Sequence, residues 1–145
     1  ADGRDITDHV RSERGGKRAS IYARIPSVRQ GLLARQRQMR AAPGLVADGR
    51  DMGTTVFPDA NLKVFLTAST EERAKRRHKQ LNDKGIDVSL AALLRDIGNR
   101  DKRDSERKVA PLKRASDARI LDSSNLTIEE VSQMILGWVK ERSPA

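Results

Sequence analysis

Residues 44–66, GLVADGRDMGTTVFPDANLKVFL, contain the pattern that decides the fold. The apolar runs at residues 45–48 and 62–67 are short and rich in Leu, Val and Phe, so each predicts a buried strand. A charged Asp-Gly-Arg-Asp sequence begins at Asp48, where the first run ends. Charged side chains at the edge of an apolar core need a physical reason.

Helical patterns surround these two runs. Residues 6–42 are basic with apolar residues at helical spacing, and Pro26 suits the first turn of a second helix there. Capping boxes, in which a hydroxyl residue is followed three positions later by Glu, open helices after Ser69 and Thr127. A further helix is expected over about 89–108. The last helix is expected to bury one apolar stripe, consisting of Ile128, Val131, Ile135 and Trp138.

A third strand is predicted at residues 118–122. Short apolar strands that alternate with helices predict an α/β fold, a parallel sheet flanked by helices. We expect one domain over residues 1–145. Because only three strands are predicted and none precedes the first helices, the sheet is expected to be incomplete on its N-terminal side.

The composition excludes several classes of function. Lys and Arg number 29 against 20 Asp and Glu, a net charge of +9, which favours anionic partners. Aromatic residues are only 3% of the chain, which argues against stacking of nucleic-acid bases. There is no cysteine, no signal-peptide pattern and no apolar run long enough to span a membrane. We therefore expect a cytoplasmic protein that does not associate with a membrane.

The first candidate site is the sequence Asp48-Gly49-Arg50-Asp51. Ligands of parallel sheets lie beyond the carboxyl ends of the strands, where this sequence is expected. An acid at a strand end can hold a magnesium-bound water in proteins that transfer phosphate. An exposed turn is the alternative, and the residues alone leave both readings open.

The second candidate lies on the helix predicted near 89–108. Its apolar stripe continues at helical spacing into Arg100, Asp104 and Arg107. A solvated face with ion pairs one turn apart is the ordinary reading. The functional reading is a mobile lid that carries arginine side chains onto phosphate.

One tempting motif fails. The Gly15-Gly16 pair is expected inside the first helix, and with Lys17 and Arg18 it suggests a phosphate loop. That loop requires a glycine five positions before the Gly-Lys pair and Ser or Thr after it, whereas Arg11 and Arg18 occupy those places.

Two long segments together resemble bacterial cytidylate kinases. They are GLVADGRDMGTTVFPDANLKVFLTASTEERAKRR, from Gly44, and RDKRDSERKVAPLKRASDARILDSSNLTIEEV, from Arg100. The Gly-Arg-Asp-Met-Gly-Thr segment and the Arg-Asp-x-x-Asp-x-x-Arg helix are the most specific parts. The resemblance implies the nucleoside monophosphate kinase fold, of the P-loop NTPase type, and ATP- and Mg²⁺-dependent phosphorylation of CMP and dCMP by a monomer.

By this resemblance, Asp51 and Ser20 meet the amino edge of cytosine and Arg29 meets N3. Uracil reverses the donor and the acceptor at these positions, which implies a preference for CMP. The resemblance assigns the phosphates to Arg50, Arg100 and Arg107, the nucleotide sugar and phosphates to Asp104, ATP to Arg76, and water-bound magnesium to Asp48.

The resemblance also divides the chain into CMP-binding helices, about 3–42, and a lid, about 85–112. Members of the family begin with a strand and a glycine-rich phosphate loop that these residues do not contain. We therefore expect the chain to be the C-terminal part of such an enzyme and to be inactive alone. A UMP/CMP kinase of broader specificity and a basic RNA-binding module are the alternatives.

Overall fold

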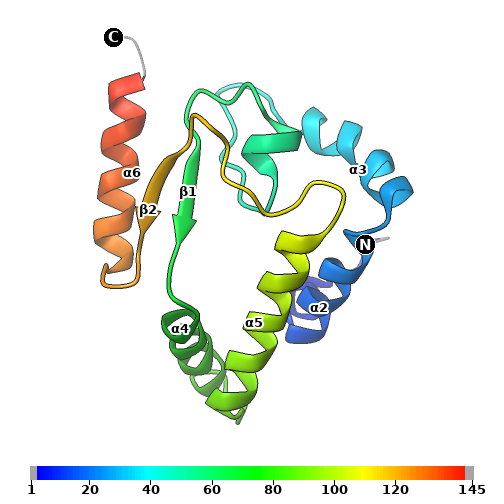
Figure 1. The fold of residues 1–145 in the computed structure, drawn as a ribbon, viewed down its shortest axis with the longest axis vertical. Helices are drawn as coiled ribbons and strands as arrows, with labels where there is room; N and C mark the ends of the chain where they lie inside the picture. Colours follow the sequence, from blue (N-terminus) through cyan, green and yellow to red (C-terminus); the bar gives the residue numbers. More distant parts are fainter. Residues whose placement is uncertain (1–2, 143–145) are drawn as a thin grey trace.

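The computed structural model describes residues 3–142 (Figure 1). Along them the elements follow in the order α1 (Thr7–Arg11), α2 (Glu13–Tyr22), α3 (Pro26–Gln38), the π-helical turn η1 (Met52–Val56), β1 (Val64–Thr67), α4 (Thr70–Asn82), α5 (Leu90–Glu106), β2 (Arg119–Asp122) and α6 (Ile128–Arg142). The predicted helices form, and Pro26 opens α3 as expected.

The strands β1 and β2 pair in parallel, with Val64 opposite Arg119 and Thr67 opposite Asp122. Helices α4 and α5 connect them, and α6 lies beside β2 (Figure 1). Parallel strands need such a crossover, because a short turn cannot return the chain to the same end of the sheet. The predicted α/β fold, a parallel sheet flanked by helices, is confirmed.

The prediction of a strand at residues 45–48 is wrong. These residues have no regular structure, and Val46 is 99% exposed. A strand requires hydrogen bonds to a neighbour, and within residues 3–142 the sheet contains β1 and β2 alone. Consequently Asp48 follows an exposed segment without regular structure rather than a buried strand.

The hydrophobic core centres on the contact between α4 and α5. Ala74, Leu81 and Leu93 are buried there, packed by the partly buried side chains of Val88, Leu94 and Ile97. This packing fixes α5 by its apolar half, so its polar half, further along the helix, projects toward α2 and α3 (Figure 1).

The apolar stripe predicted on α6 is only partly buried. Val131, Ile135 and Trp138 are half-buried, whereas Ile128 is 81% exposed.

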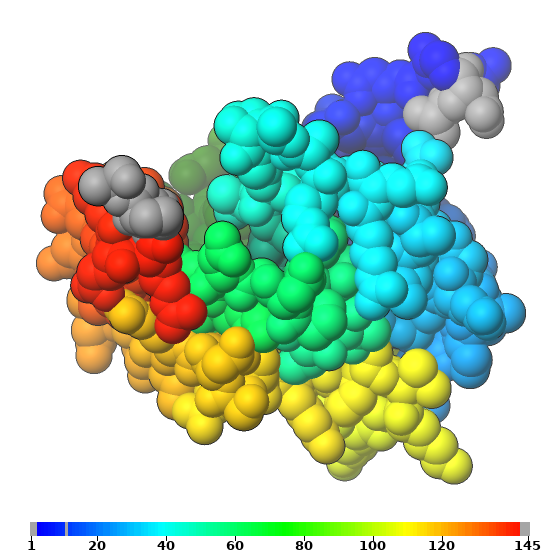
Figure 2. Space-filling model, turned by 90° about the horizontal axis from the view of Figure 1, so that it is seen from above, coloured from blue at the N-terminus to red at the C-terminus, as the bar shows by residue number. Residues whose placement is uncertain are grey.

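The solvent-accessible surface of the whole molecule is 10911 Å², against about 7,400 Å² for a compact monomer of this size. Figure 2 shows the cause, because α6 and the amino-terminal helices lie at opposite ends of the molecule. Across the described part of the chain, no helix is both long and apolar enough to cross a bilayer.

Both predicted capping residues accept the expected hydrogen bonds. The hydroxyl of Ser69 accepts from the amide of Glu72 at 3.1 Å. The hydroxyl of Thr127 accepts from the amide of Glu130 at 3.2 Å, and a Glu130 carboxylate oxygen accepts from the amide of Thr127 at 2.8 Å. The second box is therefore complete, whereas Glu72 turns instead toward Arg76.

The first helix is shorter than predicted, because it breaks at Ser12. The hydroxyl of Ser12 accepts from the amide of Gly15 at 3.0 Å and so caps α2. A Cβ atom added to Gly15 would lie 2.5 Å from the carbonyl oxygen of Val10. Glycine is thus required where α1 folds back on α2.

Substituting alanine for Gly15 is expected to lower the free energy of unfolding by about 1 kcal/mol or more, because the added methyl overlaps backbone atoms that have no free rotation. Gly98→Ala is the matched control, since no atom lies within 4 Å of its added Cβ on α5. At Gly98 the substitution changes only helix propensity, so it should raise the free energy of unfolding by about 0.5–1 kcal/mol. Urea denaturation of both variants checks this, and a shift of the same sign in both would refute the steric explanation.

Candidate functional site

The structure brings seven of the predicted site residues into one partly buried network, here called the arginine–aspartate cluster. Ser20 comes from α2 and Arg29 from α3, while Arg50 and Asp51 immediately precede η1. The remaining members, Arg100, Asp104 and Arg107, come from α5 and its C-terminal cap. Segments far apart in the sequence therefore meet where the polar half of α5 contacts α2 and the start of η1.

Asp104 is the centre of the cluster and is 1% exposed. Its two carboxylate oxygens accept from the hydroxyl of Ser20 at 2.8 Å and from Nε of Arg50 at 2.9 Å. The side chains of Arg100 and Arg107 approach it to 3.7 and 4.0 Å. A buried carboxylate is tolerated only with such partners.

Asp51 is the second buried carboxylate, at 5% exposure. It forms an ion pair with Arg29, and Nη2 of Arg107 lies 3.9 Å from its Oδ1. Its backbone carbonyl accepts from the amides of Thr55 and Val56 at 2.9 and 3.2 Å. The turn η1 thereby fixes the backbone from which this carboxylate projects.

Arg100 and Arg107 have unused donor capacity. Nε of Arg100 and Nη2 of Arg107 are buried and have no hydrogen-bond partner. Burial lowers the pKa of the Arg107 guanidinium, and the nearby carboxylates of Asp104 and Asp51 oppose that shift. Gly16 of α2 leaves space for Arg100, because a Cβ added there would lie 3.1 Å from Nη1 of Arg100.

The charges of the cluster do not balance. Four guanidinium groups face two carboxylates through the ion pairs of Arg29, Arg50, Arg100 and Arg107. This leaves two positive charges in excess, beside donors that have no partner. An arrangement of this kind can bind a dianion with several oxygens, such as a phosphate monoester.

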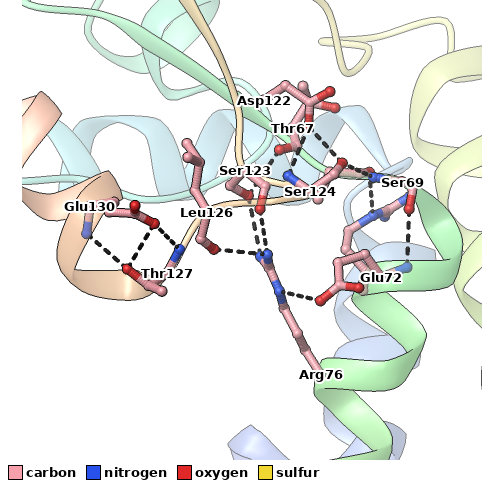
Figure 3. A network of polar contacts seen from close by, with 12 residues as sticks. Thr67, Ser69, Glu72, Arg76, Asp122, Ser123, Ser124, Leu126, Thr127 and Glu130 are labelled. Atoms are coloured by element: carbon pink, nitrogen blue, oxygen red, sulfur yellow. Dashed lines mark hydrogen bonds and ion pairs between the residues drawn. The ribbon is translucent and has the colours of Figure 1, made fainter.

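Arg76 belongs to a different network, shown in Figure 3. Its guanidinium donates to the hydroxyl of Ser123 at 3.2 Å, to the carbonyl of Ser123, and to the carbonyl of Leu126 at 3.5 Å. Nε donates to Glu72 at 3.3 Å. These bonds hold the β2–α6 loop against α4. The assignment of Arg76 to ATP stays a prediction.

Asp48 is exposed, and no described contact joins it to the cluster. Within residues 3–142 there is no group of three or more side chains of His, Cys, Asp or Glu that could hold a metal ion. Magnesium does not require such a group, because it is commonly bound by one or two carboxylates together with water and substrate phosphates. The exposed carboxylate of Asp48 fits that mode.

The sequence-based prediction of site residues did not include two arginines that support the site. Arg103 donates to the hydroxyl of Ser20 at 3.0 Å. Helical spacing could have found it, because position 103 lies three residues after Arg100 and four before Arg107. Arg37 of α3 donates to the carbonyls of Thr55 and Val56, each at 3.0 Å, and holds the end of η1. No local motif marks Arg37.

The chain was compared with known proteins. A family model described as cytidylate kinase matches residues 1–141. A cytidylate kinase of Stutzerimonas stutzeri is 59% identical over 144 residues, covering 99% of this chain and 63% of that protein. A cytidylate kinase of Burkholderia pseudomallei is 58% identical, covering 97% of this chain and 61% of that protein. A cytidylate kinase of Nitrosococcus oceani is 55% identical, covering 98% of this chain and 63% of that protein.

The chain thus spans somewhat less than two thirds of the length of these relatives. The residues matched by the family model, 1–141, span the arginine–aspartate cluster. The chain belongs to the cytidylate kinase family.

Proposed function

We propose that this chain forms the CMP-binding and lid portion of an enzyme that transfers the γ-phosphoryl group of ATP to CMP or dCMP. The observation that carries the proposal is the buried pairing of Asp51 with Arg29 beside the unpartnered donors of Arg100 and Arg107. A base-reading pair therefore lies next to phosphate-binding groups, as a nucleoside monophosphate requires. The family membership of the chain supports the same conclusion.

Asp51 and Arg29 offer one hydrogen-bond acceptor and one set of donors side by side. Cytosine presents an amino donor next to the acceptor N3, so it matches both groups. Uracil presents an acceptor and a donor in reverse order. Binding of UMP would leave buried polar groups mispaired, at a cost of about 1–3 kcal/mol for each. Ser20 is the residue assigned to a further contact at the amino edge.

The phosphate of CMP is assigned to Arg50, with Arg100 and Arg107 reaching it from α5. Without a nucleotide, Arg50 donates to Asp104 at 2.9 Å. That bond uses Nε alone, so the Nη groups of Arg50 remain for the phosphate, and Asp104 is the carboxylate assigned to the nucleotide sugar and phosphates. The arginines stabilise the charge that develops during transfer, and the reaction needs no covalent nucleophile.

ATP and Mg²⁺ are the implied co-substrate and cofactor. The carboxylate of Asp48 would hold the metal ion through water, and Arg76 is the residue assigned to ATP. When bound, Mg²⁺ neutralises charge on the phosphates. The bonds of Arg76 to Glu72 and to the 123–126 loop use four of its five N–H groups, so one hydrogen of Nη1 remains as the proposed donor to ATP.

The proposal divides the chain into CMP-binding helices at about 3–42 and a lid at about 85–112. The contacts of Ser20 and Arg29 with the cluster support the first assignment, and those of Arg100 and Asp104 support the second. Small nucleotides are the proposed ligands, and the family assignment disfavours the RNA-binding alternative. A monomeric state and a cytoplasmic location stay predictions.

The test is the affinity of the chain for CMP and for UMP, measured by titration calorimetry with Asp51→Ala alongside. The unaltered chain is expected to prefer CMP, and Asp51→Ala is expected to reduce that preference by about tenfold or more, because the acceptor for the amino group is lost.

Asp87→Ala is the control, since Asp87 is exposed and far from these contacts in sequence. Equal affinities for CMP and UMP in the unaltered chain would favour the broader UMP/CMP kinase. An unchanged preference in Asp51→Ala would remove Asp51 from base recognition.

A further inference from the structure

The two consecutive glycines of α2, which suggested a phosphate loop in the sequence, face different neighbours in the structure. Gly15 makes room for α1, whereas Gly16 lies against the side chain of Arg100 on α5. A Cβ atom added to Gly16 would lie 3.1 Å from Nη1 and 3.8 Å from Cζ of Arg100. Among residues 3–142, and apart from α2 itself, no other atom lies within 4 Å of that Cβ. The absent side chain therefore leaves room for one group, the Arg100 guanidinium.

A second contact, one helical turn away, fixes α2 against α5 (Figure 1). The hydroxyl of Ser20 donates to Oδ1 of Asp104 at 2.8 Å, and both side chains are buried. Gly16 and Ser20 are four residues apart on α2, as Arg100 and Asp104 are on α5, and residues four apart share one face of a helix. The buried bond between Ser20 and Asp104 thus resists separation of the two helices at Gly16.

The surroundings of Arg100, more than hydrogen bonds, determine where its guanidinium lies. Its Nε is buried and has no hydrogen-bond partner, and it lies 3.7 Å from Oδ2 of Asp104, too far for a hydrogen bond. The side chain as a whole is 40% exposed, so solvent leaves one side of it open. The backbone of α2 at Gly16 closes another side.

We propose that Gly16 is a positioning residue for phosphoryl transfer, because its missing side chain lets the Arg100 guanidinium lie against α2. The inference rests on the proposed function, in which Arg100 stabilises the charge that develops during transfer. A methyl group at position 16 would displace the guanidinium by a few tenths of an ångström, since the helices cannot readily separate. Catalysis is sensitive to such shifts, because a misplacement of about 1 Å can cost about 100-fold in rate.

Stability distinguishes this role from a purely structural one. Alanine favours the interior of a helix more than glycine does, and the methyl group of Gly16→Ala meets only the end of a flexible side chain. This variant should therefore keep or raise the midpoint of thermal denaturation while its turnover falls. A glycine required for folding, such as Gly15, would instead lose stability on substitution.

The experiment measures kcat and KM for CMP in a protein of the full length of its relatives, assayed with ATP and Mg²⁺. Gly16→Ala should lower kcat about three- to tenfold and leave KM within about twofold, because the displaced group acts mainly in the transition state. In an Arg100→Ala background the same substitution should leave kcat unchanged within about twofold, because the group that it displaces is already absent.

Gly31→Ala is the matched control. Gly31 lies inside α3, and no atom lies within 4 Å of its added Cβ. Both substitutions gain helix propensity, so both should keep or raise the midpoint of thermal denaturation, and only Gly16→Ala should lose turnover. Their comparison isolates the contact with Arg100 from the general effect of replacing a helical glycine.

The outcomes separate the inference from the function on which it rests. An unaltered protein that does not phosphorylate CMP would overturn both. If the unaltered protein phosphorylates CMP and Gly16→Ala has the same kcat as Gly31→Ala, the positioning role alone is overturned. A further loss of kcat when Gly16→Ala is added to Arg100→Ala would also overturn that role, because Gly16 would then act on another group.

Discussion

Asp104→Asn is expected to reduce the free energy of unfolding by about 3–5 kcal/mol, the usual cost of removing one partner from a buried ion-pair network. Asparagine keeps the shape of the side chain but replaces one accepting oxygen, beside Ser20 or Arg50, by an NH₂ group, and it removes the charge that Arg100 and Arg107 share. The excess of positive charge in the cluster then rises from two to three. Solvent reaches Arg50 and Arg100 but not the position of the lost carboxylate, because Asp104 is 1% exposed.

Urea denaturation measures this effect, with Asp59→Asn as the control. Asp59 also forms an ion pair, with Arg40 at 2.9 Å, but its side chain is 63% exposed. Solvent screens such an exposed pair, so the control should change little. Added pyrophosphate should restore part of the stability of Asp104→Asn by binding the folded state. If both variants lost similar amounts of unfolding free energy, the burial of Asp104 would not explain its contribution to stability.

The sequence predicted the elements that local chemistry determines. The caps at Ser69 and Thr127 and the start of α3 at Pro26 form because each depends on residues within one turn of the chain. The strand predicted at 45–48 failed because a strand depends on a distant neighbour. Its apolar composition indicates a segment suited to burial but does not supply a partner.

The burial of α6 was overestimated for a similar reason. Periodicity identifies which face of a helix is apolar, and the half-buried Trp138 does lie on that face, with the guanidinium of Arg119 5.1 Å from the centre of its ring. Periodicity does not determine how much surface is available to cover the face. Ile128, at the start of the same stripe, therefore remains exposed.

Helical spacing placed Arg100, Asp104 and Arg107 on one face of α5, and their convergence in the structure agrees with it. Spacing could not show that Ser20 would meet that face, because the contact joins segments more than eighty residues apart. The partners of Arg76 were equally hidden, since they lie on the β2–α6 loop. Sequence thus identified candidate residues, and only the fold determined their partners.

Arg100→Ala is expected to lower the turnover of CMP by about 100- to 1,000-fold in a protein of the full length of its relatives, assayed with ATP and Mg²⁺. Nε of Arg100 is buried without a partner and lies 3.7 Å from Asp104, so a donor is available for a developing negative charge. The loss should appear in kcat more than in KM, because Arg50 is the assigned phosphate ligand of the ground state.

Arg95→Ala is the matched control, since Arg95 lies on the same helix with its side chain exposed. It removes the same charge from α5 and should leave turnover within about twofold, because exposed charges act weakly through solvent. Normal turnover in Arg100→Ala would show that Arg100 does not stabilise the transition state. A raised KM with unchanged kcat would instead make Arg100 a ligand of bound CMP, because the lost interaction would then be as strong in the ground state as in the transition state.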